Sequence, residues 1–145
     1  MGKTILTSRA RANGGREGRV VSDDNVIDLE LEMPGTKGKE DVKTSNPEQL
    51  FASGYSACFD GAFKLMARQA KKRVESHTTA EVHLHEDDSD GGVKISAKLL
   101  VEVTGVTQEE AEELLEKAHG FCPYSKATRG NIDVELSVKA VETLS

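Results

Sequence analysis

Several residue types are scarce in this chain of 145 residues, which has no tryptophan, three prolines and two cysteines. No apolar run approaches the roughly 20 residues that a membrane-spanning helix needs, and no apolar segment follows the basic start of the chain. A membrane span and a signal peptide are therefore not expected, and the expected compartment is the cytoplasm. Lasting disulfides are rare there, whereas transient catalytic ones are the usual kind.

Positive charge is also in deficit. The 19 Lys and Arg residues against 25 Asp and Glu give a formal net charge of −6, which argues against a nucleic acid as partner. The length suits one domain over residues 1–145 that can bury a core without crosslinks, so a structural disulfide is not expected. The few aromatic residues gather near the two cysteines: Phe51, Tyr55, Phe59 and Phe63 near Cys58, and Phe121 and Tyr124 near Cys122.

The N-terminal third of the chain predicts strands. Apolar and acidic residues alternate from Ile27 to Met33, which is typical of a strand with one dry face. Residues 13–18 before it form a glycine-rich hairpin or loop, and a polar loop is expected from Pro34 to Ser45. A helix then begins at Pro47, because Pro suits the first helical position and the preceding Asn46 can cap the helix. Its apolar run continues to residue 66.

The remaining segments predict two strands, two helices and a last strand. Apolar residues alternate over 80–84, 93–103 and 132–138, and residues 88–92 read as a hairpin turn. Thr107 and Glu110 have the spacing of a capping box, Gly120 is expected to close that helix, and Cys122-Pro123 opens a short turn or helix. Hairpin-like connections favour antiparallel sheets packed against helices, an α+β fold.

The position of Cys58 does not favour its reactive form. A thiolate is the nucleophile, yet Cys58 lies 12 residues beyond the Asn46 cap, roughly 18 Å into the helix and out of reach of the helix dipole. Apolar surroundings raise a thiol pKa, so a reactive Cys58 needs a cation from elsewhere in the fold. Arg16 is the candidate, since flanking glycines permit close approach, and Glu48 is the candidate acid to pair with it.

Cys122 lies in a different setting. The residue before a proline is pushed toward extended geometry, so Cys122 could cap a short helix with its sulfur near the positive end of the dipole. That would make it a competent second thiol. From spacing alone, a redox pair and two inert buried thiols both stay open.

Four segments carry a resemblance to a known family. Residues 46–59, 121–134, 14–18 and 20–24 resemble the first-cysteine signature, the second-cysteine signature, the arginine loop and the following strand of the organic hydroperoxide resistance (Ohr) branch of the Ohr/OsmC family. The two cysteine signatures are long, and the Cys-Pro-Tyr-Ser stretch separates this branch from its OsmC relatives. The resemblance implies an OsmC-like fold with antiparallel sheets packed on a long central helix.

The same resemblance implies a thiol-dependent peroxidase. Cys58 is then the peroxidatic thiol and Cys122 the resolving thiol, Arg16 holds the Cys58 thiolate, and Glu48 orients Arg16. The family implies an intertwined homodimer with active sites at the subunit interface and no cofactor. It further implies dihydrolipoamide or a lipoylated protein as reductant. Two alternatives stay open: an OsmC-like peroxidase of broader peroxide range, and a non-enzymatic interaction protein with inert thiols.

Four finer expectations follow. An apolar collar that suits organic hydroperoxides is predicted from Phe51, Tyr55, Phe59, Phe121 and Tyr124, with core packing as the alternative for the individual aromatic residues. Glu48 lies about 15 Å before Cys58 along a straight helix, so a kink or break between Gly54 and Gly61 is predicted. A metal site at His83, His85 and Asp87 on one strand face is a minor alternative. His119 is read as a residue that suits a helix end.

Overall fold

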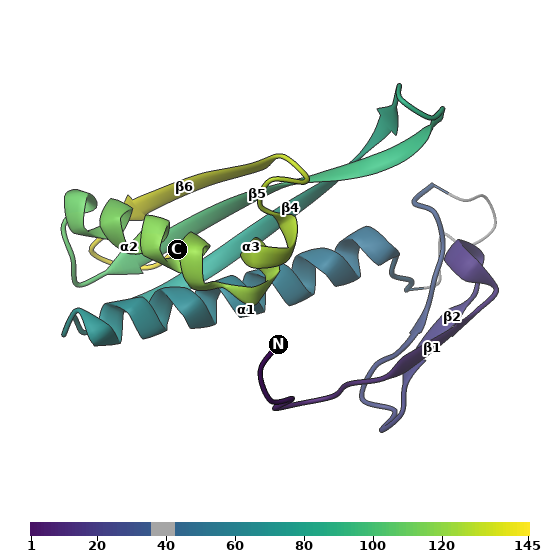
Figure 1. Cartoon of the computed structure of the whole chain (residues 1–145), viewed down its shortest axis with the longest axis horizontal. Coiled ribbons are helices and arrows are strands. Elements are labelled where there is room, and N and C mark those ends of the chain that lie inside the picture. The colour runs from purple at the N-terminus through teal and green to yellow at the C-terminus, as the bar shows by residue number, and fades with distance from the viewer. Residues whose placement is uncertain (36–42) are drawn as a thin grey trace. The chain divides into compact units, whose positions relative to one another are not determined.

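The structure is a computed structural model that describes residues 1–35 and 43–145 (Figure 1). The chain divides into two compact units, Met1–Leu50 and Phe51–Ser145, and each unit is described by itself. The single domain over residues 1–145 stays a prediction. Part of the polar loop expected from Pro34 to Ser45 lies outside the described residues. No helix in the described ranges is long and apolar enough to cross a membrane.

The unit Met1–Leu50 contains a small antiparallel sheet in the order β1-β2-β3. Its elements are β1 (Ala10–Asn13), the 3₁₀ turn η1 (Gly15–Glu17), β2 (Arg19–Ser22) and β3 (Asp28–Glu30). β3 is shorter than the alternation over residues 27–33 predicted, although Leu31 continues it by a single parallel bridge to Ser45. Leu31 is buried, whereas Ile27, Leu29 and Met33 are exposed, so the expected dry face is uncovered in the single chain.

The long helix α1 (Pro47–Gln69) begins as predicted, because Asn46 Oδ1 accepts a hydrogen bond of 2.8 Å from the Gln49 N–H. The break predicted between Gly54 and Gly61 is wrong, since α1 is continuous through both glycines (Figure 1). An interior glycine costs only about 1 kcal/mol relative to alanine, which packing along a 23-residue helix overrides.

The unit Phe51–Ser145 holds a second sheet in the order β4-β5-β6. β4 (Glu75–Asp87) and β5 (Gly92–Thr104) form the predicted antiparallel hairpin. β6 (Val134–Ala140) instead pairs parallel with β5, which corrects the expectation of antiparallel pairing throughout. The reason is the crossover: two helices between β5 and β6 return the chain to the end of the sheet where β5 began.

These helices are α2 (Gln108–Phe121) and α3 (Pro123–Thr128). The predicted capping box of α2 is present: the Glu110 N–H donates to Thr107 Oγ1 and the Thr107 N–H donates to Glu110 Oε1. Gly120 does not close α2, which ends one residue later. Pro123 ends it instead, because a residue before proline avoids the helical region, and Cys122 has φ −59° and ψ 126°.

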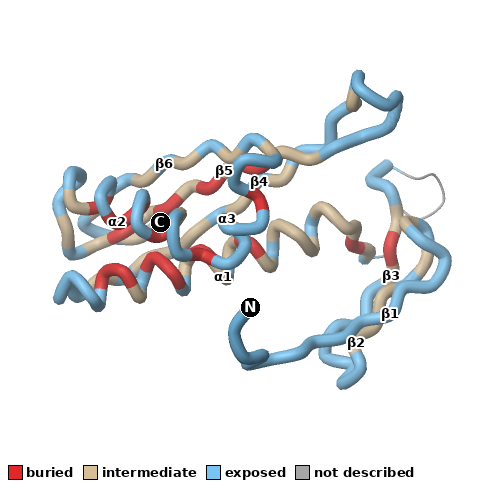
Figure 2. The backbone as a smooth tube through the Cα atoms, viewed as in Figure 1, coloured by how far each residue is buried: buried red, intermediate tan, exposed pale blue. Residues whose placement is uncertain are grey.

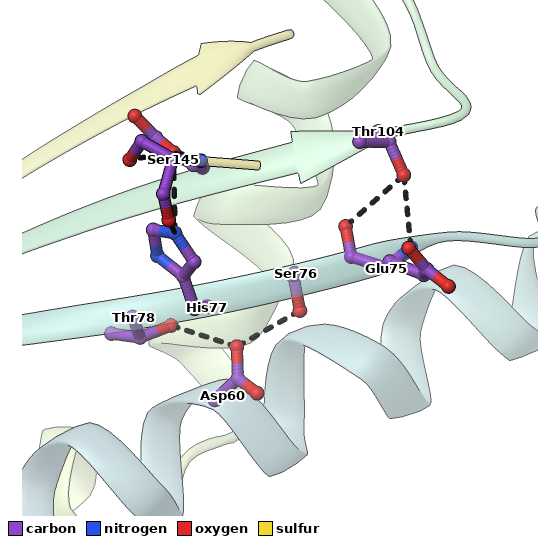
Figure 3. A network of polar contacts seen from close by, with 8 residues as sticks. Asp60, Glu75, Ser76, His77, Thr78, Thr104 and Ser145 are labelled. Carbon is purple, nitrogen blue, oxygen red and sulfur yellow. Dashed lines mark hydrogen bonds and ion pairs between the residues drawn. The ribbon is translucent and has the colours of Figure 1, made fainter. Parts of the chain in front are cut away.

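Helices α1 and α2 cover one face of the second sheet. The buried residues of β5 alternate (Ala97, Leu99, Val101 and Val103), so they mark a single covered face. They share one core with buried residues of α1 and α2, as the red segments of Figure 2 show. Asp60 also ties α1 to β4, since its carboxylate accepts hydrogen bonds from Ser76 and Thr78 (Figure 3). The α+β class predicted from the sequence is confirmed.

Candidate active site

The two cysteines meet in the unit Phe51–Ser145. Cys58 projects from α1 and is partly buried, whereas Cys122 lies at the junction of α2 and α3 and is fully buried. Their Sγ atoms are 3.5 Å apart, and both are free thiols. A disulfide has its sulfur atoms about 2.05 Å apart, so an approach of about 1.5 Å separates this arrangement from a covalent bond.

The turn that carries Cys122 also contacts Cys58, through the Cys122 sulfur and the Tyr124 backbone N–H. Cys122 occupies the N-cap position of α3, yet its side chain makes no capping hydrogen bond, and its Sγ instead contacts Cys58 Sγ. The sequence had suggested that the Cys122 sulfur would lie at the positive end of the short helix. The backbone N–H of Tyr124, in the first turn of α3, instead acts on Cys58 and lowers its pKa.

The net effect of this environment is to keep Cys58 protonated. Burial raises the pKa of the Cys58 thiol above its ordinary value, and the adjacent Cys122 raises it further. The Tyr124 N–H acts in the opposite direction without overcoming these effects. Within its own unit, Cys58 therefore still requires a cation to become a thiolate near neutral pH, as its place in the helix had indicated.

A guanidinium–carboxylate pair lies in the unit Met1–Leu50. Arg16, in η1, donates from Nη1 to Glu48 Oε2 at 2.8 Å and from Nη2 to Glu48 Oε1 at 2.6 Å. This two-pronged geometry fixes the plane of the guanidinium group. The hydrogen bond to Arg16 holds the pKa of Glu48 below its usual range, and Glu48 in turn raises the pKa of Arg16. The Glu48 side chain is only 15% exposed.

Glycines shape the loop that presents Arg16. Gly14 has φ +81°, a backbone conformation that side chains disfavour. At Gly18 a Cβ atom would lie 1.7 Å from the Asn13 carbonyl oxygen, which no other residue could tolerate. The close backbone approach expected of the glycines around Arg16 thus occurs within the loop itself.

The five predicted collar residues have three different environments. Phe51 and Tyr124 line an apolar cavity of about 530 Å³ with Pro123, Ala127 and Ile132. Tyr55 and Phe59 are fully buried in the core and do not line that cavity. Phe121 is 46% exposed and lies beneath the Lys126 ammonium group.

Tyr124 fits against α1 at Gly54. A Cβ atom on Gly54 would lie 2.6 Å from Tyr124 Oη, so only glycine leaves room for this ring. The ring centroid of Tyr124 is 6.1 Å from that of Phe51 and 5.7 Å from that of Tyr55. The sequence pattern indicated a weak point in the helix at Gly54, because nothing near Gly54 in the sequence signals contact with a ring 70 positions away.

A buried polar cluster also escaped the sequence reasoning. The Tyr55 hydroxyl lies 2.9 Å from Ser125 Oγ and 3.0 Å from Thr128 Oγ1, and all three residues are buried. Ser125 Oγ lies 2.9 Å from His119 Nδ1. Burial lowers the pKa of His119, and the Arg129 cation lowers it further, so the ring is neutral near pH 7. Tyr55 had been assigned to the collar and His119 to the helix end.

The metal alternative gains no support. The rings of His83 and His85 are 6.0 Å apart on β4, and His85 is hydrogen-bonded to Ser96. Among the residues that the structure describes, no group of three or more His, Cys, Asp or Glu side chains is placed to hold a metal ion.

The chain is similar in sequence to known proteins of one family. Residues 37–137 match the family model described as OsmC-like protein. The chain is 51% identical over 139 residues to organic hydroperoxide resistance protein OhrA of Bacillus subtilis, covering 95% of this chain and 99% of the relative. It is 47% identical over 135 residues to OhrB of the same organism, covering 93% and 98%.

Solved structures of organic hydroperoxide resistance proteins have the same fold. The crystal structure of Bacillus subtilis OhrB superposes with a TM-score of 0.89 at 45% identity, covering 94% of this chain and 100% of that chain. An organic hydroperoxide resistance protein from Elizabethkingia anophelis superposes with a TM-score of 0.87 at 45% identity, covering 97% and 100%.

Proposed function

The chain belongs to the OsmC-like family, within its organic hydroperoxide resistance branch, and we propose that it is a cysteine-based peroxidase that reduces organic hydroperoxides to alcohols. The observation that carries the proposal is the pair of free thiols with sulfur atoms 3.5 Å apart, one partly accessible and one buried. Relatives named for organic hydroperoxide resistance, matched over nearly their whole length, support the choice of substrate class.

The reaction proceeds in three balanced steps. The Cys58 thiolate attacks one peroxide oxygen, the O–O bond breaks, and the alkoxide leaves as the alcohol after taking up a proton; Cys58 becomes a sulfenic acid. The Cys122 thiol then attacks the Cys58 sulfur, forming the Cys58–Cys122 disulfide and releasing water. A dithiol reduces that disulfide by exchange and is itself oxidised to a disulfide.

Arg16 supplies the positive charge that Cys58 lacks in its own unit. Its guanidinium remains charged at any physiological pH, and Glu48 fixes its orientation through two hydrogen bonds. In this role Arg16 lowers the Cys58 pKa against the effect of burial. Glu48 is the positioning residue, because its contact is to Arg16.

The apolar cavity lined by Phe51, Pro123 and Tyr124 fits the organic part of the hydroperoxide. Phe51 and Tyr124 contribute rings to its wall, and Pro123 and Tyr124 directly follow Cys122 in the chain. Hydrogen peroxide gains nothing from such a wall, whereas an alkyl or acyl chain is stabilised by burial there. This favours an organic hydroperoxide reductase over the OsmC-like alternative of broader peroxide range.

The protein acts as a homodimer in this proposal, and its reductant is dihydrolipoamide or a lipoylated protein. Exposed apolar side chains in the unit Met1–Leu50 support the dimer, since a second copy would remove them from water. They are Ile5, Leu6, Val26, Ile27, Leu29 and Met33. The family assignment supports the reductant.

The decisive experiment compares two serine variants by hydroperoxide consumption and intact mass. Cys58→Ser should abolish turnover, whereas Cys122→Ser should still consume one equivalent of cumene hydroperoxide and stop at an oxidised Cys58. The unmodified protein should lose the mass of two hydrogens, with a peptide crosslink at Cys58 and Cys122. Full turnover by Cys58→Ser would refute the proposal, and so would a protein that loses no thiols. Rates with hydrogen peroxide test the broader alternative.

A further inference from the structure

The buried polar cluster behind the cysteines forms a single ordered chain of hydrogen bonds. Each hydroxyl group has one proton to donate. The Thr128 hydroxyl donates to the backbone carbonyl of Ser125 at 3.3 Å, so the Tyr55 hydroxyl donates to Thr128. Ser125 then donates to Tyr55, and Ser125 in turn accepts from the Nδ1–H of His119. All four contacts are satisfied in this direction and in no other.

This chain of hydrogen bonds lies next to the two thiols along both helices. Tyr55 is three residues before Cys58 on α1, and Ser125 is three residues after Cys122, on α3. Residues three apart lie on the same side of a helix, one turn from each other. The Tyr55–Ser125 contact therefore sits one helical turn from the Cys58–Cys122 contact, so α3 is attached to α1 at two adjacent points.

Of these two points, only the hydroxyl chain stays unchanged during the proposed reaction. The contact between the two sulfur atoms changes whenever Cys58 gains an oxygen. Tyr55 and Ser125 are both fully buried, and losing one partner would leave a buried polar group without a hydrogen bond. The hydroxyl chain thus holds α3 in place while the sulfur chemistry proceeds.

We propose that Tyr55 is a positioning residue whose hydroxyl, through Ser125 and Thr128, keeps Cys122 beside Cys58 for disulfide formation. This inference rests on the proposed peroxidase function. In the step concerned, the Cys122 thiol displaces the sulfenic oxygen of Cys58, one S–S bond forms, and the oxygen leaves as water. The competing reaction is attack of the sulfenic acid on a second hydroperoxide, which gives a sulfinic acid and a second alcohol.

The test uses full-length variants that remove one hydroxyl each. Tyr55→Phe and Thr128→Val delete a hydroxyl and keep the shape of the side chain, whereas Thr128→Ser keeps the hydroxyl and serves as the matched control. Each protein is mixed with cumene hydroperoxide in rising excess. Loss of the Cys58 thiol reports the first step, and intact mass separates disulfide from sulfinic acid.

The first step should be unchanged in Tyr55→Phe, because the Tyr55 side chain does not line the apolar cavity. The rate of disulfide formation should fall roughly five- to tenfold in Tyr55→Phe and Thr128→Val, because about one net hydrogen bond is lost. Sulfinic acid should therefore accumulate at a lower excess of hydroperoxide, and Thr128→Ser should behave as the unmodified protein. A merely structural role would lower the unfolding temperature without changing this partition.

The inference is overturned if both hydroxyl-deleted variants form the disulfide as fast as the unmodified protein. It is equally overturned if Thr128→Ser shows the same loss as Thr128→Val, since the hydroxyl would then not matter. Should Tyr55→Phe not fold, Thr128→Val against Thr128→Ser still decides the question. Failure of the peroxidase function itself is distinct, because the unmodified protein would then form no disulfide at all.

Discussion

The two glycines of α1 should respond differently to replacement by alanine: Gly61→Ala should stabilise the protein, whereas Gly54→Ala should not. A Cβ atom at Gly61 would meet no atom within 4 Å, so Gly61→Ala gains the usual helix preference of about 1 kcal/mol. At Gly54 the new methyl group would lie 2.6 Å from Tyr124 Oη and 3.0 Å from Cε2. That is up to about 1 Å inside the ordinary contact distance of about 3.5 Å.

The two contributions at Gly54 can be set against each other. Overpacking typically costs about 1–3 kcal/mol, whereas the alanine helix preference returns about 1 kcal/mol. Gly54→Ala should therefore lie between no change and a loss of about 2 kcal/mol in the free energy of unfolding. For a chain of this size, Gly61→Ala should raise the unfolding temperature by roughly 3 °C, and Gly54→Ala should not.

The functional consequence provides the sharper assay. Displacing the Tyr124 ring shifts the turn that holds Cys122, so Gly54→Ala should slow disulfide formation after one equivalent of hydroperoxide, measured by intact mass. Gly61→Ala should form the disulfide at the unmodified rate. The reasoning fails if Gly54→Ala stabilises the protein as much as Gly61→Ala and forms the disulfide equally fast.

Other outcomes concern the ion pairs. Arg16→Lys should lower the peroxidase rate in stopped-flow assays, because an ammonium cannot make both hydrogen bonds to Glu48, and an unchanged rate would contradict the role of Arg16. Because the Glu48 pKa is lowered from its ordinary value of 4.5, the stabilisation by Glu48 is present above that pH and is lost as the pH falls through the folded pKa, so Glu48→Gln should weaken the acid dependence of the urea midpoint. The Lys72 hydrogen bond, together with that from the Thr107 N–H, lowers the Glu110 pKa from 4.5 to about 2. Glu110→Gln should therefore reduce the slope of unfolding free energy against pH between about pH 2 and 4.5, and an unaltered slope would contradict this role of Glu110.

Interactions between residues close in the sequence were predictable. Asn46 and Thr107 cap their helices as their spacing indicated, because a capping side chain reaches only backbone groups two or three residues away. The β4-β5 hairpin follows from alternation on both sides of a glycine turn. The long cysteine signatures likewise sufficed to indicate the family, which the comparisons confirm.

Contacts between distant segments were not predictable in the same way. The parallel pairing of β6 depends on where the α2 and α3 crossover returns the chain, and alternation is identical in parallel and antiparallel strands. Tyr55 and Phe59 looked like collar residues because they neighbour Cys58 in the sequence, yet their helix faces direct them into the core.

The sequence by itself determined the order of the elements, the N-caps of α1 and α2 and the family, because local backbone preferences and long motifs carry that information. Only the tertiary structure decided that two thiols separated by 64 positions lie 3.5 Å apart. It likewise decided that the Tyr124 ring packs against Gly54 and that the Tyr55 hydroxyl is hydrogen-bonded to Ser125 and Thr128. The physical reason is that each of these contacts joins α1 to α3 or to the residue that caps α3, and the packing of helices on a shared core, unlike a cap or a turn, depends on residues throughout the chain.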